Sequence, residues 1–274
     1  VNSSQMGSSQ ERKKTKSLLV LGGNGFVGSA ICKYAIDSGK YDRVKSLSRS
    51  GEPPTTSGEW KDQVQWLKGD VFKGDEWDAH LDDVQSVVSC IGAFGTDEQM
   101  ERICGDANIH AVDTVVKHNE KVAEEKAANF GFISAHQFSS LPSFVLHGYY
   151  NGKKRAEQHI LQKFGAANCM ILRCPFIYGQ RDVTLPVSNK HVSLPLNMVG
   201  VPLEKFGHCD QTKAAKKALP FLDFMLTPSV SVDEVAAVMV NGLQQQCAEG
   251  GHIPSGILDV YEIHQHGERL IENN

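Results

Sequence analysis

Short apolar runs alternate with segments of helical spacing along most of the chain. The run at 18–21 leads through a glycine-rich turn into a segment whose apolar residues recur every three or four positions, at Val27, Ala30, Ile31, Tyr34 and Ala35. A longer segment of helical spacing occupies 98–117. Further short apolar runs lie at 64–67, 86–91, 130–134 and 170–173, and residues 43–48 alternate between polar and apolar side chains as a strand does. Short continuous apolar runs are typical of buried parallel strands, and strands that alternate with helices form βαβ units. The pattern therefore predicts an α/β fold built on a doubly wound parallel sheet.

The two ends of the chain depart from this alternation. Residues 1–17 are rich in Ser and Gln and carry four basic residues against one acid, so we expect a disordered tail or the processed remnant of a targeting segment. Residues 180–230 lose the strand–helix alternation, and a helix starting near Ser231 and a last strand at 256–263 follow. These features predict one main domain at 18–180 and a small irregular region at 181–274 that completes it as a lid or substrate region.

The turn at 22–28 has the glycine spacing of a dinucleotide-binding fingerprint. Both Gly23-x-Gly25-x-x-Gly28 and Gly22-x-x-Gly25-x-x-Gly28 fit it. In either register the first glycine allows a tight turn, Gly25 lets a pyrophosphate approach the backbone, and Gly28 lets the helix pack closely on the strand. The N-terminus of that helix would offer free N–H groups to the phosphates. The strand–turn–helix context predicts a dinucleotide site that also contains Asn24, Phe26 and Val27.

The end of the second predicted strand bears on the choice of dinucleotide. NAD-binding proteins usually place an acid about 20 residues past the fingerprint, where it binds the ribose 2′-hydroxyl. Here Ser48, Arg49 and Ser50 occupy that place. A guanidinium and hydroxyls suit a 2′-phosphate because they donate charge-assisted hydrogen bonds to it. The sequence therefore favours NADP(H) over NAD, the alternative being that Arg49 is only a surface charge.

Two further segments follow predicted strands and extend the expected cofactor site. Asp70 and Val71 follow the third strand, where Asp70 would either accept a hydrogen bond from the adenine amino group or cap the next helix. The small residues after the fourth strand would let the chain pass close to the cofactor. The site therefore also includes Cys90, Ile91 and Gly92.

A serine, a tyrosine and a lysine predict the chemistry. Ser134 closes the fifth predicted strand, and Tyr149 and Lys153 lie four positions apart in a segment with helical character. Because positions i and i+4 share a helical face, the ammonium can stabilise a phenolate and bring the phenol below its ordinary pKa of about 10. Tyr149 would act as general acid/base beside the nicotinamide, and Ser134 would orient a carbonyl or alcohol.

A second pair at the same spacing competes with this one. Tyr150 and Lys154 are also four positions apart. We prefer Tyr149 with Lys153, because Ala156-Glu157 follows Lys153 at the proper interval.

Together these motifs resemble the extended and atypical members of the short-chain dehydrogenase/reductase superfamily. The resemblance spans about residues 17–263 and rests on the glycine turn, Ser134, Tyr149-x-x-x-Lys153 and the run Arg173-Cys174-Pro175-Phe176-Ile177-Tyr178-Gly179. It implies a Rossmann fold and an NAD(P) cofactor that also contacts Tyr149, Lys153 and Pro175. It further implies catalysis by Ser134, Tyr149 and Lys153.

The stretches 20–30 and 148–153 are similar to a narrower subgroup. It contains chloroplast epimerase-like proteins, reductase-like proteins associated with coenzyme Q biosynthesis, and the NADPH-binding accessory subunit of mitochondrial complex I. This resemblance implies an organelle, with the chloroplast favoured over the mitochondrion. The fifth strand ends in Ser134-Ala135-His136 where extended epimerases carry a serine pair, which puts the role of Ser134 in question.

The overall composition argues against nucleic-acid binding, a disulfide framework, a metal site and a membrane-spanning helix. With 28 basic and 32 acidic residues the net charge is −4, so no basic field attracts nucleic acid. The seven cysteines include no Cys-x-x-Cys pair and are expected to be reduced thiols. The 11 histidines are scattered without metal-ligand spacing, so no metal site is predicted. No apolar run approaches the length of about 20 residues that a membrane-spanning helix needs.

Two functions remain open. Apolar residues at 194–206 suit a hydrophobic, quinone- or isoprenoid-like substrate, a lid packed on the core, or a membrane-surface contact. The first function is an NADP(H)-dependent oxidoreductase or epimerase that acts on such a small molecule in an organelle. The second is a non-catalytic NADPH-binding structural or assembly subunit of a quinone-biosynthetic, respiratory or photosynthetic complex. The sequence predicts neither the substrate nor the oligomeric state.

Overall fold

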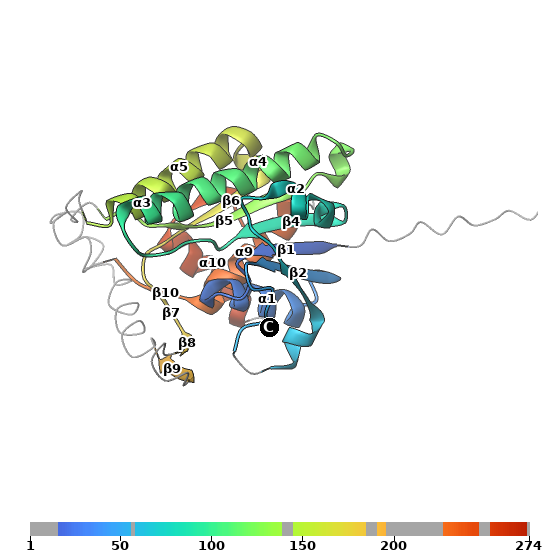
Figure 1. The fold of residues 1–274 in the computed structure, drawn as a ribbon. Coiled ribbons are helices and arrows are strands. Elements are labelled where there is room, and N and C mark those ends of the chain that lie inside the picture. Colours follow the sequence, from blue (N-terminus) through green and yellow to red (C-terminus); the bar gives the residue numbers. More distant parts are fainter. Residues whose placement is uncertain are drawn as a thin grey trace, which may run out of the picture.

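The computed structural model describes residues 16–55, 58–138, 145–184, 191–195, 227–246 and 253–272. At its centre lies a seven-stranded sheet in the order β11-β6-β5-β4-β1-β2-β3, with every neighbouring pair parallel (Figure 1). The strands are β1 (Ser17–Leu21), β2 (Arg43–Ser48), β3 (Val64–Lys68), β4 (Val84–Ser89), β5 (Asn129–Ala135), β6 (Cys169–Cys174) and β11 (Gly256–Leu258). The strand order reverses between β1 and β4, which confirms the predicted doubly wound parallel sheet.

Helices cover both faces of the sheet (Figure 1). One face carries α1 (Phe26–Asp37), α9 (Val232–Gln246) and α10 (Val260–Glu272). The other carries α2 (Gly74–Trp77), α3 (Asp97–Met100), the π-helical segment η3 (Glu101–Asp106), α4 (Ala107–Asn119) and α5 (His147–Phe164). Short 3-10 turns lie at Glu59–Gln63, Asp78–Leu81, Glu124–Lys126 and Ala166–Asn168. Beyond β6, two small two-stranded sheets form, β7 (Ile177–Tyr178) with β10 (Val230–Ser231) and β8 (Gln180–Thr184) with β9 (His191–Pro195).

Strand β1 shows how the sheet separates two apolar cores. Leu18 and Val20 belong to a cluster that includes residues of α1 and α9, whereas Leu19 and Leu21 belong to a cluster with residues of α4 and α5. Alternate side chains of a strand point to opposite faces, so a strand covered on both faces is predominantly apolar on both. This packing explains the continuous apolar runs from which the strands were predicted.

Only the first part of the last predicted strand, 256–263, forms a strand. The run at 256–263 divides into β11 and the start of α10, with Asp259 between them. The Oδ1 atom of Asp259 accepts hydrogen bonds from the N–H groups of Tyr261 (2.8 Å) and Glu262 (3.0 Å). In return the Oε2 atom of Glu262 accepts one from the N–H of Asp259 at 2.9 Å. This reciprocal capping box starts a helix, so the apolar residues after Asp259 face the core with helical spacing.

The predicted helices begin and end close to their expected positions. The segment at 98–117 is one run of α3, η3 and α4, interrupted by the π-helical turn. Helix α5 begins at His147, so it contains both members of the predicted Tyr/Lys pair, and α9 confirms the helix expected near Ser231.

The irregular region predicted after β6 is described only in part. It contains the antiparallel hairpin of β8 and β9. Residues 185–190 and 196–226 lie outside the described part of the chain, and so does most of the apolar segment at 194–206. Across the described residues, no helix is both long enough and apolar enough to span a bilayer.

Candidate cofactor and active site

The glycine turn joins β1 to α1 at the switch point of the sheet. Gly22 has a φ of +80°, which favours glycine, and its N–H donates to the carbonyl oxygen of Leu47 at 2.8 Å. The Gly22 carbonyl accepts from the N–H of Gly25 at 3.0 Å. A Cβ on Gly28 would stand 2.3 Å from that same carbonyl oxygen. Gly22 thus makes the tight turn and Gly28 allows the close packing. A Cβ on Gly23 would stand 2.5 Å from Ser46 Oγ, so the turn is compatible with both predicted registers.

The first turn of α1 can receive a diphosphate. Gly25 is its N-cap, is exposed, and provides no side-chain cap. A Cβ on Gly25 would have one close neighbour, the Gly22 carbonyl oxygen at 3.3 Å, which is a tight contact. The first N–H groups of a helix have no partner within the helix, and the N-terminus carries a positive partial charge. The predicted pyrophosphate therefore fits the N–H groups of residues 26–28.

The end of β2 lies against this turn. The side-chain amide of Asn24 donates to Ser50 Oγ at 3.1 Å, and Ser48 Oγ accepts from the N–H of Gly51 at 3.1 Å. Arg49 stands between the two serines with its side chain exposed. The structure thus brings the end of β2, at which the predicted 2′-phosphate residues Ser48 and Arg49 lie, beside the glycine turn.

Asp70 does not cap the helix that follows it. Its Oδ1 atom accepts from the N–H of Phe72 at 3.1 Å, and the N-cap of α2 is Lys73, which provides no side-chain cap. The capping alternative is therefore wrong, because the carboxylate turns back onto its own loop. The contact of Asp70 and Val71 with adenine stays a prediction.

The chain after β4 connects the glycine turn with the predicted lysine. The N–H of Cys90 donates to the Leu21 carbonyl at 2.9 Å, and a Cβ on Gly22 would lie 3.7 Å from the Cys90 carbonyl oxygen. A Cβ on Gly92 would lie 3.5 Å from Lys153 Nζ. The predicted residues Cys90, Ile91 and Gly92 therefore run from one part of the site to the other, while Pro175 follows β6.

Lys153 is buried at the carboxyl ends of β4 and β5. Its Nζ atom donates to the carbonyl oxygen of Ile133 at 2.7 Å and to that of Ile91 at 3.1 Å. Burial lowers the pKa of this ammonium group. Lys154 is exposed instead, so burial favours the pair of Tyr149 and Lys153 over its neighbour.

Tyr149 lies one turn before Lys153 and among aromatic rings. Its ring stacks on that of Phe94, with centroids 5.1 Å apart and planes 19° apart, and meets Tyr150 edge-on at 5.5 Å. Burial raises the pKa of the Tyr149 phenol, the opposite of the expected lowering. The reason is that the Lys153 ammonium is directed at two backbone carbonyls while the phenol is removed from water. The spacing of Tyr149 and Lys153 predicted that they share a helical face, but it did not predict the raised pKa of the phenol.

The hydroxyl of Ser134 is directed at a carboxylate. Ser134 Oγ donates to Glu157 Oε1 at 2.5 Å, and both residues are buried. Arg173 holds the same carboxylate, with Nη2 2.6 Å from Oε2 and Nε 3.1 Å from Oε1. The contact that Ser134 makes is therefore with Glu157 of α5, which the sequence had not predicted.

Asn108 is a site residue that motif spacing did not single out. It is buried, its Oδ1 atom accepts from Ser89 Oγ at 2.5 Å, and its amide nitrogen donates to the carbonyl oxygens of Cys104 (2.9 Å) and Ile91 (3.3 Å). The Ile91 carbonyl therefore accepts from both Asn108 and Lys153. Through these hydrogen bonds Asn108 connects the π-helical turn to the end of β4. The sequence indicates this role only by placing a polar amide within an apolar helical stripe.

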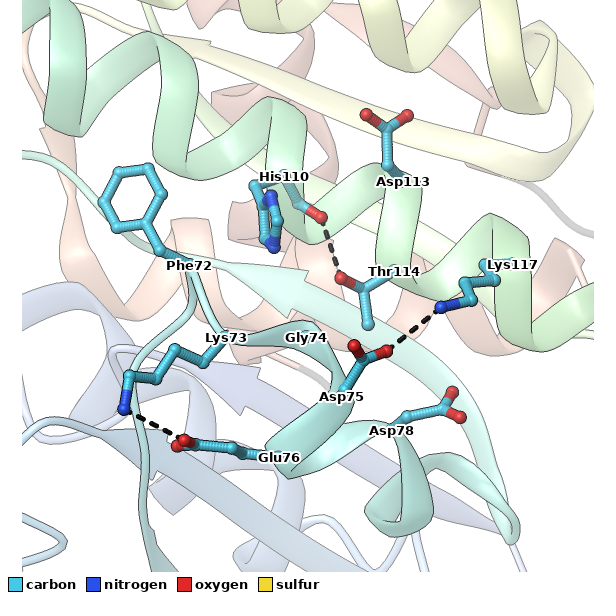
Figure 2. A pocket seen from close by; sticks show the side chains of 10 residues that line it. All are labelled: Phe72, Lys73, Gly74, Asp75, Glu76, Asp78, His110, Asp113, Thr114 and Lys117. Atoms are coloured by element: carbon cyan, nitrogen blue, oxygen red, sulfur yellow. Dashed lines mark hydrogen bonds and ion pairs between the residues drawn. The ribbon is translucent and has the colours of Figure 1, made fainter.

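A separate cleft of about 440 Å³ lies between α2 and α4 (Figure 2). Charged groups along it pair with one another, Lys73 Nζ with Glu76 Oε1 at 2.9 Å and Lys117 Nζ with Asp75 Oδ1 at 3.0 Å. None of the predicted site residues lines it, and we assign it no binding role. Within the described ranges, no group of three or more His, Cys, Asp and Glu side chains is placed to hold a metal ion.

Comparison with known proteins places the chain among nucleotide-binding proteins. Residues 22–193 match the family described as NAD(P)H-binding. An uncharacterized chloroplastic protein of Arabidopsis thaliana is 40% identical over 233 residues, which cover 84% of this chain and 72% of that protein. MIOREX complex component 2 of Saccharomyces cerevisiae is 25% identical over 279 residues, covering 85% and 95%. The fold is similar to that of the Bordetella bronchiseptica enzyme WbmH in complex with NAD+, with a TM-score of 0.56, 13% identity, and coverage of 89% and 75%.

Proposed function

Because the chain belongs to the family of NAD(P)H-binding proteins, we propose that it is an NADP(H)-dependent oxidoreductase acting on an apolar small molecule. The observation that carries the proposal is the arrangement of Tyr149 and Lys153. Both lie on α5, and Lys153 spans the carboxyl ends of β4 and β5 through Ile91 and Ile133. In an open α/β sheet, ligands bind at this edge, beside the switch point.

In this proposal the cofactor extends from the glycine turn to Lys153. The turn at 22–28 binds the pyrophosphate, Ser48 and Arg49 bind the 2′-phosphate, and Asp70 with Val71 borders the adenine. The nicotinamide end is bordered by Cys90, Ile91, Gly92, Tyr149, Lys153 and Pro175. When bound, the cofactor supplies or accepts a hydride.

Tyr149 moves the proton of the reaction. Because burial raises its pKa, the phenol is protonated near neutral pH, which is the form that donates a proton to a carbonyl oxygen. The Lys153 ammonium, one helical turn away, stabilises the negative charge that proton donation leaves on the phenol oxygen.

Exposed apolar side chains support an apolar substrate. Within the described residues, three of the exposed large apolar side chains border this edge: Phe94 follows β4, Leu146 precedes α5, and Phe176 follows β6. Phe94 is 73% exposed although it stacks on Tyr149. A flat apolar carbonyl compound, quinone- or isoprenoid-like, suits such a rim. We place the reaction in an organelle, with the chloroplast favoured because the Arabidopsis relative is named chloroplastic.

A non-catalytic NADPH-binding subunit of an organellar complex is the second candidate. Two observations support it: the Lys153 ammonium already has two carbonyl partners, and the yeast relative is named as a complex component. In that case the nucleotide stabilises the native state by binding to it alone.

Replacing Tyr149 by Phe separates the two candidates. NADPH oxidation is followed with 2,3-dimethoxy-5-methyl-1,4-benzoquinone as the probe, and NADPH affinity by nucleotide fluorescence. We expect Tyr149→Phe to lower kcat by about 10²- to 10⁴-fold, because the general acid is lost, and to keep NADPH affinity. Lys154→Ala, at an exposed neighbouring position, is the matched control and keeps full turnover. Equal turnover in the wild type and Tyr149→Phe contradicts the catalytic proposal.

A further inference from the structure

Ser134, Glu157 and Arg173 form a buried anchor between α5 and the sheet. Ser134 is 3% exposed and Glu157 is 5% exposed. Ser134 on β5 and Arg173 on β6 are direct partners in the sheet register, and both donate to the Glu157 carboxylate. Charge-assisted hydrogen bonds to both oxygens of a buried carboxylate fix its position and compensate for its removal from water. We call these three residues the Glu157 anchor.

The Glu157 anchor is linked to Lys153 in two ways. The Ile133 carbonyl, which accepts from Lys153 Nζ at 2.7 Å, belongs to the peptide that joins Ile133 to Ser134. The bond from Ser134 to α5 therefore holds the acceptor of the ammonium in place. In addition, Glu157 lies four positions after Lys153 on the same helical face.

The charge of Lys153 depends on the groups that face it. Burial opposes the charge, and the groups that favour it are Cys104, Cys90, Cys174 and Glu157. Burial raises the pKa of Cys90 and of Cys174 to about 12, so these two thiols are neutral near pH 7. Among these groups Glu157 is the only carboxylate.

We infer that Ser134 and Glu157 are positioning residues that hold the Lys153 ammonium in place, and that Ser134 does not touch the substrate. The inference rests on the proposed function, since it concerns the lysine that serves Tyr149. It assigns Ser134 a different role from the substrate-orienting one that the sequence predicts.

Ser134→Ala tests whether the hydroxyl acts on the substrate. Removal of a donor that orients a reacting oxygen costs about 10²- to 10³-fold in kcat. We expect Ser134→Ala to lose less than about tenfold with the benzoquinone probe. A loss of tenfold or more at unchanged NADPH affinity overturns the inference and returns Ser134 to the substrate. Tyr149→Phe is measured in parallel: if it keeps full turnover, the proposed function fails whatever Ser134→Ala does.

A titration of Lys153 tests the electrostatic half of the inference without any turnover. Lysine side chains are labelled with ¹³C, and the Lys153 resonance is assigned by its loss in Lys153→Arg. Glu157→Gln keeps the size of the side chain and removes its charge, so the Lys153 resonance should titrate at lower pH than in the wild type. Glu98→Gln, an exposed carboxylate on α3, controls for net charge and leaves the titration unchanged. An unchanged titration in Glu157→Gln overturns the inference. If Glu157→Gln does not fold, the turnover of Ser134→Ala decides between the two roles of Ser134.

Discussion

At the scale of single residues, three glycines contribute differently to the nucleotide site. Gly22 adopts a left-handed conformation, and Gly28 brings α1 so close to the turn that a Cβ would meet the Gly22 carbonyl oxygen at 2.3 Å. Gly25 has an ordinary φ of −82°, and its hypothetical Cβ is 3.3 Å from that oxygen. Gly22 and Gly28 are therefore required by the fold. For Gly25 we propose a role in ligand binding, because a residue without a side chain leaves the helix N-terminus accessible to a phosphate.

Arg49 decides the choice between NADPH and NADH in this account. Arg49→Glu replaces a donor to the 2′-phosphate by a repelling charge. We expect NADPH affinity to fall by about 10- to 100-fold while NADH affinity changes little. Nucleotide fluorescence titrations measure both, and Lys40→Glu, another exposed cation, controls for the change in net charge. Preserved NADPH preference in Arg49→Glu means that Arg49 is only a surface charge.

Local spacing predicted only part of the candidate site. The shared helical face of Tyr149 and Lys153 could be predicted from the sequence, because the two residues lie only four positions apart on one helix. The partner of Ser134 could not be predicted, because Glu157 lies 23 positions away and meets Ser134 only when α5 packs on β5. The raised pKa of Tyr149 has the same origin, since burial is a property of the packed molecule.

At the scale of elements, strands were easier to predict than the boundary between a strand and a helix. A strand buried on both faces leaves a mostly apolar run, and β2 leaves an alternating one, which is why the predicted strands from 18–21 to 170–173 match β1 to β6 closely. The run at 256–263 is equally apolar but contains the Asp259 capping box. Periodicity alone cannot distinguish a short strand followed by a helix from one longer strand.

The capping box of α10 makes a prediction about stability. Asp259→Ala removes the acceptor for two N–H groups of the first turn. We expect the free energy of unfolding to fall by about 1 kcal/mol, as for other helix N-caps. Asp259→Asn keeps an acceptor oxygen and should retain most of the stability. Urea denaturation of both variants measures the difference, and an equal loss in both would argue against capping as its cause.

The contact between α9 and α10 predicts a dependence of stability on pH. Burial by itself would raise the pKa of Glu234, but hydrogen bonds from His264 (2.7 Å) and from the N–H of Ser231 (2.9 Å) lower it below its ordinary value. A carboxylate whose pKa is lower in the folded state stabilises the fold above its unfolded pKa of about 4.3, and this stabilisation is lost as the pH falls through the folded value.

Glu234→Gln should therefore weaken the acid dependence. Urea denaturation between about pH 6 and pH 3 measures the free energy of unfolding of both proteins. We expect the wild type to lose stability more steeply than Glu234→Gln over this range. Parallel curves would show that Glu234 contributes nothing to the acid dependence.

At the scale of the whole molecule, the reversal of strand order brings the parts of the site together. β1 lies between β2 and β4 (Figure 1). The glycine turn therefore meets both the end of β2 and the chain after β4, where Lys153 Nζ donates to the Ile91 carbonyl. This Rossmann arrangement is shared by the enzyme WbmH at 13% identity, so the topology establishes the fold alone. Nucleotide binding follows from the family, and the proposed turnover rests on Tyr149 and Lys153.

Calorimetric titration of the wild type and Gly25→Ala with NADPH tests the central claim most directly. The wild type should bind one NADPH per chain. Gly25→Ala should still fold without ligand, because its φ suits alanine and the Gly22 carbonyl oxygen, 3.3 Å from the new Cβ, has to shift only slightly. It should lose most of its NADPH affinity, because the new methyl group stands where the pyrophosphate approaches the helix. No binding to the wild type, or equal binding to Gly25→Ala, would contradict a nucleotide site at the glycine turn.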